Sequence, residues 1–190
     1  MRIGTFSVLF WLLGHVSVQA QTANSQHGVG PRRVASEKHK FSVLLPTGWF
    51  YYLGGDLPSF YNFTPGKSIQ GHIPSGGASI VVIRNEALSG NNNVDQLSAW
   101  ADERIKRRHG INSTRTLTEG PKDATERQAL YVSFDQPAFS QSDEPLRFVI
   151  ALWRFRDFLL GAELSYIKGD PKAIEYERLL HVFTMSFRPT

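Results

Sequence analysis

The feature that most constrains the fold is a long apolar hairpin near the C-terminus, in residues 146–167. Apolar side chains occupy both alternating sets of positions in residues 146–155, so a strand made from this segment buries both of its faces. Arg156 and Asp157 are expected to form a tight turn, and residues 158–167 then return as a second, antiparallel strand. A sheet built around this hairpin needs cover above and below.

One helix that can supply such cover is predicted between Asn93 and Gly110. Asn93 is a suitable N-cap, Gln96 completes a capping-box-like pair, and Gly110 ends the helix. Acidic residues come early and basic residues late, as the helix dipole favours. Val94, Leu97, Ala101 and Ile105 recur at helical spacing, with Trp100 beside them. Asp102–Lys106 and Glu103–Arg107 are predicted i,i+4 ion pairs on the outer side of the helix.

A second helix is predicted to follow Asp170 and Pro171. Asp170 acts as the cap, and proline is favoured at the first helical position because it has no N–H to lose there. The helical period predicts a buried stripe of Ala173, Tyr176, Leu180 and Phe183.

The remaining segments indicate further short strands joined by turns. Pro46, Thr47 and Gly48 interrupt an apolar run, and since proline cannot continue a strand ladder, the chain is expected to turn a corner there. The order of elements is strands, helix, strands, helix. This order predicts an α+β fold, an antiparallel β-sheet sandwiched between helices (α-β-α). The other predicted strands are residues 41–45, 49–53, 60–63, 79–83, 112–118 and 128–134.

The N-terminus has the pattern of an export signal. Residues 1–20 combine a basic start, an apolar stretch and small residues before Ala20, which predicts a signal peptide cleaved after Ala20; the alternative is a buried N-terminal helix. In the chain that remains, residues 21–36 are expected to form a flexible leader and residues 37–190 a single domain with a substantial core. The expected location is periplasmic or secreted, with no integral membrane segment after cleavage.

Composition narrows the classes of partner and site. The 190 residues include no cysteine, which excludes disulfides and thiolate chemistry. The net charge of +4 comes from 21 basic and 17 acidic residues, a mixture that does not indicate nucleic-acid binding. At most, it favours peripheral contact with acidic surfaces.

Three segments resemble the PsbP/DcrB-like family. "KFSVLLPTGWFYY" is similar to the opening of these proteins, "RFVIALWRFRDFLLGAELSY" to their late hairpin, and "YERLLHVFTMSF" to their closing helix. The resemblance implies an α-β-α fold, shared with a small Ran-binding nuclear import factor. It also implies a non-enzymatic accessory or binding protein, with no catalytic residues to carry over. The export signal is unlike a long transit peptide, which argues against a photosynthetic role.

The sequence predicts no catalytic, cofactor-binding or metal-binding residues. No GxSxG nucleophile motif and no phosphate-binding glycine motif is present. No two histidines have HxH or HxxxH spacing, so a metal site would have to assemble in three dimensions. The histidines after Ala20 are His27, His39, His72, His109 and His181.

Two groups of residues are candidates for contact with a partner or ligand. The aromatic group can either fill the core or line a binding surface. The basic group can dock an acidic partner, or can simply stabilise the C-terminal end of a helix. The candidates are Trp49, Tyr51, Tyr52 and Tyr61 in the aromatic group, and Arg104, Arg107 and Arg108 in the basic group.

These patterns favour an exported, non-enzymatic accessory protein that acts through protein–protein contacts with an envelope protein or complex. An alternative is a small-ligand carrier that uses the aromatic group as a groove. A third interpretation, a metal-dependent hydrolase, has no motif to support it.

Overall fold

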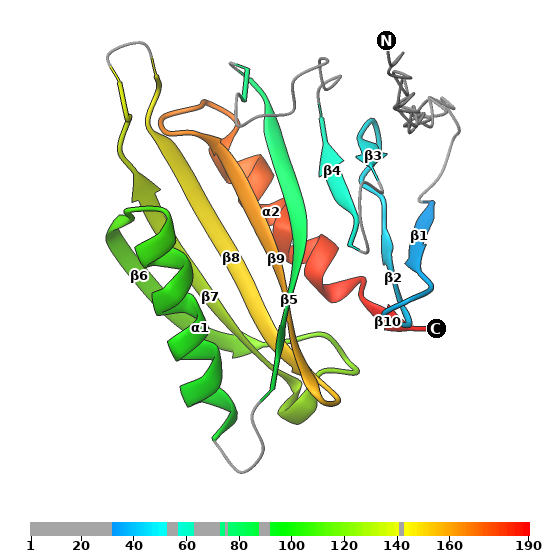
Figure 1. Ribbon diagram of the computed structural model, residues 1–190. Helices are drawn as coiled ribbons and strands as arrows, with labels where there is room; N and C mark the ends of the chain where they lie inside the picture. The colour runs from blue at the N-terminus through cyan, green and yellow to red at the C-terminus, as the bar shows by residue number, and fades with distance from the viewer. Residues whose placement is uncertain (1–31, 53–56, 63–72, 75, 88–91, 141–142) are drawn as a thin grey trace, which may run out of the picture.

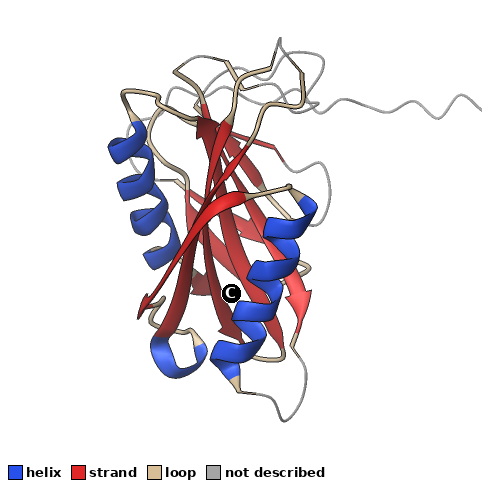
Figure 2. Cartoon of the chain, turned by 90° about the vertical axis from the view of Figure 1, so that its left-hand side faces the viewer, coloured by secondary structure: helices blue, strands red, loops and turns tan. Residues whose placement is uncertain are grey.

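The computed structural model describes residues 32–52, 57–62, 73–74, 76–87, 92–140 and 143–190. A large seven-stranded antiparallel sheet carries a helix on each face, and a small three-stranded sheet lies beside it (Figures 1 and 2). The predicted signal peptide and most of the predicted leader lie outside the described residues. No helix in the described ranges has both the length and the apolar character needed to cross a membrane.

The predicted hairpin forms the centre of the large sheet. Strand β8 (Leu146–Phe155) pairs with β9 (Phe158–Ile167) along their whole length, from Leu146 opposite Ile167 to Phe155 opposite Phe158. Arg156 has a φ of 55°, the positive value that a two-residue hairpin turn requires at its first central position. Most residues of both strands are buried, which confirms that each strand is covered on both faces.

The hairpin is extended on both sides by antiparallel strands. The sheet order is β3-β4-β5-β9-β8-β7-β6, so β6 and β3 are its two edges. This arrangement confirms the predicted α+β fold with an antiparallel sheet between helices. The added strands are β3 (Phe50–Tyr52), β4 (Ser59–Tyr61), β5 (Ala78–Glu86), β6 (Ile111–Glu119) and β7 (Gln128–Gln136).

Helix α1 (Asn93–Arg107) covers β7 and β8 on one face of the sheet. The predicted N-cap, Asn93, is wrong by one residue, since Asn92 caps the helix. The side chain of Asn92 accepts the N–H of Val94 at 2.8 Å, while Asn93 lies inside the helix and is buried. The core beneath the helix contains Leu97, Trp100 and Ala101 from α1, and Leu130, Val132, Phe134, Phe148, Ile150, Leu152 and Leu159 from the strands.

Only one of the two ion pairs predicted along α1 forms as expected. Glu103 pairs with Arg107 on the exposed side of the helix. Asp102 instead reaches across to Arg115 on β6, because the strand brings a guanidinium within its range. The prediction of an Asp102–Lys106 pair was therefore wrong, and α1 is tied to the edge strand instead.

Helix α2 (Ala173–Met185) covers β9 and β8 on the opposite face. It begins later than predicted, since Asp170 and Pro171 belong to the preceding turn. Asp170 stabilises this turn instead of capping the helix, because its carboxylate accepts the N–H of Lys172, the residue before the helix, at 2.8 Å. The predicted stripe is confirmed: Tyr176, Leu180 and Phe183 are buried, and Ala173 packs against the same core.

A small sheet extends the α2 layer. It consists of β1 (Arg33–Ser36), β2 (Phe41–Leu44) and β10 (Arg188–Pro189). The predicted leader is thus too long at its C-terminal end, because residues 33–36 pair with β2 and belong to the domain. The ring of Phe41 stacks on that of Phe187 with centroids 5.1 Å apart. Phe187 in turn meets Trp153 of β8 at 5.4 Å, so this sheet packs against the large one.

The corner predicted at Pro46–Gly48 joins the two sheets. The N–H of Trp49 donates to the carbonyl of Pro46 at 3.1 Å. Gly48 has a φ of 77°, which glycine adopts without strain. The chain leaves the small sheet at β2 and enters the edge of the large sheet at β3. The corner is confirmed.

Candidate functional site

The two helices leave part of the sheet uncovered on the α2 side. Helix α2 packs on β8 and β9, and all nine residues of the edge strand β6 are exposed. Thr114 faces Ser133, and Thr116 faces Tyr131, whose ring packs against the α2-side core. Alternation along the strands therefore places these hydroxyls on the α2 side. We call this surface the polar face: Thr114, Thr116, Thr118, Tyr131, Ser133, Arg147, Glu177 and His181.

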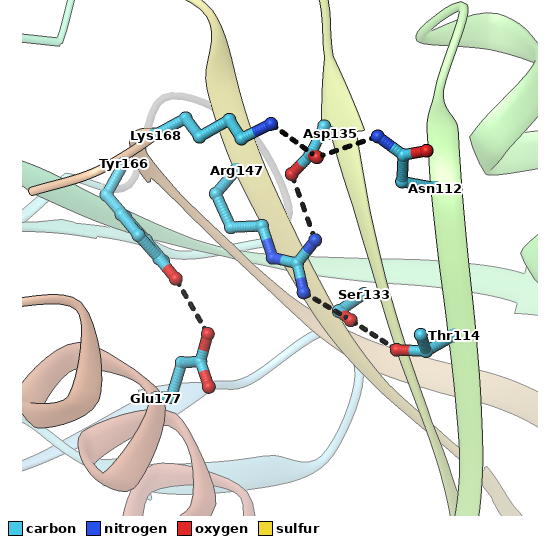
Figure 3. Close-up of polar contacts among 8 residues, drawn as sticks. All are labelled: Asn112, Thr114, Ser133, Asp135, Arg147, Tyr166, Lys168 and Glu177. Carbon is cyan, nitrogen blue, oxygen red and sulfur yellow. Dashed lines mark hydrogen bonds and ion pairs between the residues drawn. The ribbon is translucent and has the colours of Figure 1, made fainter.

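Asp135, near the end of β7, anchors one border of the polar face (Figure 3). This residue is only 5% exposed. Arg147 of β8 donates to its carboxylate at 2.9 Å, Lys168 lies 2.9 Å from its second oxygen, and the amide of Asn112 donates at 3.3 Å. Three strands and the segment after β9 thus converge on one carboxylate.

The pKa of Asp135 shows that these contacts outweigh its burial. Burial acts in the direction of a higher pKa, because a low-dielectric environment disfavours the charged carboxylate. Hydrogen bonds from Lys168, Arg147 and Asn112, together with the charge of Arg147, hold the pKa below its usual value. Asp135 is therefore an anion at neutral pH and fixes its partners in place.

Arg147 connects Asp135 to the hydroxyl groups of the polar face. Its second terminal nitrogen donates to the hydroxyl of Ser133 at 2.8 Å, and that hydroxyl lies 2.7 Å from the hydroxyl of Thr114 on β6. A continuous chain of polar contacts thus runs from the end of β7 to the edge of the sheet (Figure 3).

Two tyrosines connect the sheet to α2. Tyr166 donates to Glu177 at 2.7 Å; burial, reinforced by the Glu177 carboxylate, raises the pKa of this tyrosine well above its usual value. The hydroxyl of Tyr131 lies 3.2 Å from Nδ1 of His181, and burial also raises the pKa of Tyr131. Both phenols therefore stay protonated, and Tyr166 remains a hydrogen-bond donor.

The polar face supplies ordered hydrogen-bonding groups. Ser133 contacts a guanidinium and a hydroxyl, neither of which can act as the general base that a serine nucleophile needs. Across the described ranges, no three His, Asp or Glu residues gather closely enough to hold a metal ion. The polar face offers hydroxyls, an imidazole and a carboxylate, fixed on rigid strands and one helix.

The predicted basic group lies on the other face of the sheet. Arg104 and Arg108 both bind Glu163 of β9, Arg104 through Nε at 3.0 Å and Arg108 through a terminal nitrogen at 2.9 Å. Arg107 pairs with Glu103 and projects furthest into solvent, with its side chain 66% exposed. Arg104 and Arg108 are thus paired with a buried carboxylate, and Arg107 with an exposed one.

The predicted aromatic group does not form one surface. Tyr61 is buried in the α2-side core, and Trp49 and Tyr51 pack against the margin of that core. Tyr52 alone among these four residues is markedly exposed, at 46%. The aromatic group lies at the β3 edge, far across the sheet from α1 and β6 (Figure 1), so the structure does not bring the two predicted groups together.

Sequence reasoning missed the polar face, although one signal was present. Arg147 occupies an inward position of a mostly apolar strand, on the same side as Val149, Ala151 and Trp153. A charge at such a position requires a partner, because an unpaired buried charge is costly. Asp135, which directly follows the predicted strand 128–134, carries the opposite charge.

Comparisons with known proteins address the fold. No protein-family model matches the chain, and no curated protein matches it. The Ran-binding protein Mog1p of Saccharomyces cerevisiae is similar in structure, with a TM-score of 0.57 at 10% identity over 85% of this chain and 96% of that one. A point mutant of Mog1 gives a TM-score of 0.58 at 10% identity, covering 84% and 96%. Cyanobacterial PsbP from Synechocystis gives 0.45 at 14% identity, covering 86% and 96%.

The likeness to Mog1 extends over nearly the whole of that protein and over 84–85% of this chain. At 10% identity it shows the fold alone. The chain has the Mog1-like α-β-α fold that its resemblance to PsbP/DcrB-like proteins predicted.

Proposed function

We propose that this protein is a non-enzymatic binding protein that recognises another protein through the polar face. The observation that carries the proposal is the combination of exposure and order at this surface. Thr114 and Thr116 are open to solvent, yet they stand on a strand beside Ser133, which Arg147 holds in place. A surface that is ordered before binding loses less conformational entropy when a partner docks.

The chemistry of the polar face suits a partner with mixed polar character. Hydroxyls donate and accept hydrogen bonds, Glu177 accepts them, and His181 can do either. The yeast protein with the same fold is named as a Ran-binding protein. This name is consistent with a fold that serves protein recognition. The side chains of the present chain determine which partner it binds.

The proposed place of action is the cell envelope, after export. The apolar stretch in residues 1–20 and the small residues before Ala20 support it. N-terminal sequencing of the protein recovered from its native cells tests the proposal, because cleavage after Ala20 yields a chain that begins with Gln21. A recovered chain that retains residues 1–20 would refute export by a cleaved signal.

The carrier alternative receives less support from the structure. Its proposed groove requires aromatic side chains that are free to meet a ligand, but Tyr61 is buried and Trp49 and Tyr51 pack against the core. Filling the core accounts for these three residues.

The binding proposal can be tested with two variants that introduce the same residue on opposite faces. His181→Arg places a long cation on the polar face, and Ala99→Arg places one on the exposed side of α1. Crosslinking in the native envelope followed by purification should recover one partner with the unmodified protein and with Ala99→Arg, but much less of it with His181→Arg. Equal recovery with both variants would refute the polar face as the docking surface, and consistent recovery of no partner would refute the binding function.

A further inference from the structure

The edge strand β6 is a long, open and regular strand. It pairs only with β7, and its other side meets no strand among the described residues. A bulge between Ile111 and Thr114 interrupts its beginning, and Gly120 and Pro121 follow its end. The regular part of the edge is therefore residues 114–119. Such an edge presents unpaired backbone groups, which natural proteins usually cover or block.

The register shows which backbone groups point outward. The N–H of Gly120 donates to the carbonyl of Arg127 at 2.8 Å, one step beyond the last ladder pair, Glu119–Gln128, and in the same register. Position 120 therefore directs its backbone toward the strand that contains Arg127 and Gln128. Hydrogen-bonded and non-hydrogen-bonded pairs alternate along such a ladder. Arg115, Leu117 and Glu119 therefore direct their N–H and C=O groups away from β7.

The side chains of these three residues form a charge pattern that suits an antiparallel copy of the strand. They lie on the α1 side of the sheet, since Arg115 and Leu117 are opposite the core residues Val132 and Leu130. Leu117 is apolar and 45% exposed, with a cation two residues before it and an anion two residues after it. The charges on either side of Leu117 are thus complementary to those of an antiparallel copy of the same strand.

We propose that β6 pairs with β6 of a second copy of this chain, antiparallel and centred on Leu117, to form a homodimer with one continuous sheet. In this register Leu117 faces the partner's Leu117, and Arg115 faces the partner's Glu119 on either side. Each of these three residue pairs exchanges two backbone hydrogen bonds. Centring on Thr116 or Thr118 instead would bring the bulge or Pro121 into the ladder and would leave Arg115 without an opposite carboxylate.

The dimer is compatible with the contacts already present. Arg115 also binds Asp102 of α1, and a guanidinium has donors enough for both carboxylates. On the other side of the sheet, Thr116 faces the partner's Thr118, a pair that can exchange hydroxyl hydrogen bonds. The two-fold axis stands perpendicular to the sheet, so both α1 helices lie on one face.

The test is the molecular mass of the purified protein, measured by sedimentation equilibrium across a concentration series. The unmodified chain should be a dimer. Leu117→Pro should be a folded monomer, because it removes an outward N–H and no ladder bond to β7. Arg115→Glu and Glu119→Arg should each weaken the dimer at least tenfold, since each places like charges opposite one another.

Combining the two reversals should restore the dimer, and mixing the two single variants should give a heterodimer. Asp102→Asn is the control for the lost contact to α1 and should remain dimeric. The proposal fails if the unmodified chain is monomeric at its highest soluble concentration, if folded Leu117→Pro still dimerises, or if the double reversal does not recover association. Should Leu117→Pro not fold, the charge variants alone decide.

Discussion

Two nearly buried carboxylates, Glu163 and Asp135, lie on opposite faces of the sheet, and each is held by two cations. Glu163 is 3% exposed and Asp135 is 5% exposed. They differ in what their partners connect. The partners of Glu163 come from a helix, whereas those of Asp135 come from the sheet and its connecting segment.

Glu163 joins two layers of the molecule. It lies in the middle of the central strand β9 and binds Arg104 of α1 and Arg108, the residue that caps the C-terminal end of α1. Arg108 also stacks over the ring of Phe148 at 4.9 Å, which adds a cation–π contact beside the ion pair. This cluster fixes the helix on the sheet and offers little to an outside partner.

Asp135 orders a single layer instead. Its partners lie beside it, on β6, on β8 and just after β9, and through Arg147 and Ser133 they continue onto the exposed polar face. The ion pairs of Glu163 thus hold a helix on the sheet, whereas those of Asp135 order an exposed surface. The comparison predicts different costs when each carboxylate is removed.

The largest effect is expected for Glu163→Gln. The amide keeps the shape but leaves two guanidiniums without a counter-charge, one of them only 18% exposed. Removing one partner of a buried pair costs about 3 kcal/mol of unfolding free energy. Urea denaturation measures it. Arg107→Gln is the control, because that exposed pair should contribute less than about 1 kcal/mol. Equal losses would show that Glu163 does not hold the layers together.

A smaller loss, about 2 kcal/mol, is expected for Asp135→Asn. Lys168 is half exposed and can turn to water once the carboxylate is gone, so less charge is left uncompensated. The variant should, however, disturb the polar face, because Arg147 loses the contact that positions Ser133. Backbone amide chemical shifts of β6 and β7 should change in Asp135→Asn and stay nearly constant in Glu163→Gln. The reverse pattern would contradict the assigned roles.

The contribution of Asp135 should also disappear in acid. Its pKa is lower in the folded protein than in the unfolded chain. Its stabilisation is therefore complete above the unfolded value, about 3.9, and is lost as the pH falls through the folded pKa. The difference in unfolding free energy between the unmodified protein and Asp135→Asn should be constant near neutrality and shrink below about pH 4. A difference that grew in acid would mean that the pKa shift has the opposite sign.

The sequence predicted the layers well and the polar face poorly, for a physical reason. Periodicity reports which positions are apolar, so the double-sided hairpin and the stripe of α2 could be read directly. It does not report which polar residues meet across strands: Asn112, Asp135 and Lys168 converge only because β6, β7 and β9 take their places in the sheet. Periodicity likewise does not report that Phe41 and Trp153 both pack on Phe187, which joins the small sheet to the large one.

The smallest stability effect is expected at the polar face itself. Tyr131→Phe keeps the ring against the core and removes a hydroxyl whose recorded contact is with the exposed His181. Unfolding free energy should therefore fall by about 0.5 kcal/mol. Tyr166→Phe removes the half-buried contact to Glu177. This change should cost more, about 1 kcal/mol.

If the polar face is the docking surface, affinity for the crosslinked partner should fall more in Tyr131→Phe than in Tyr166→Phe, which is the opposite order to the stability losses. Binding titrations of the two folded variants against that partner measure the affinities. Affinity losses in the same order as the stability losses would indicate that the tyrosines act only through folding. At a recognition surface, a residue can contribute more to binding than to stability, so the two orders differ.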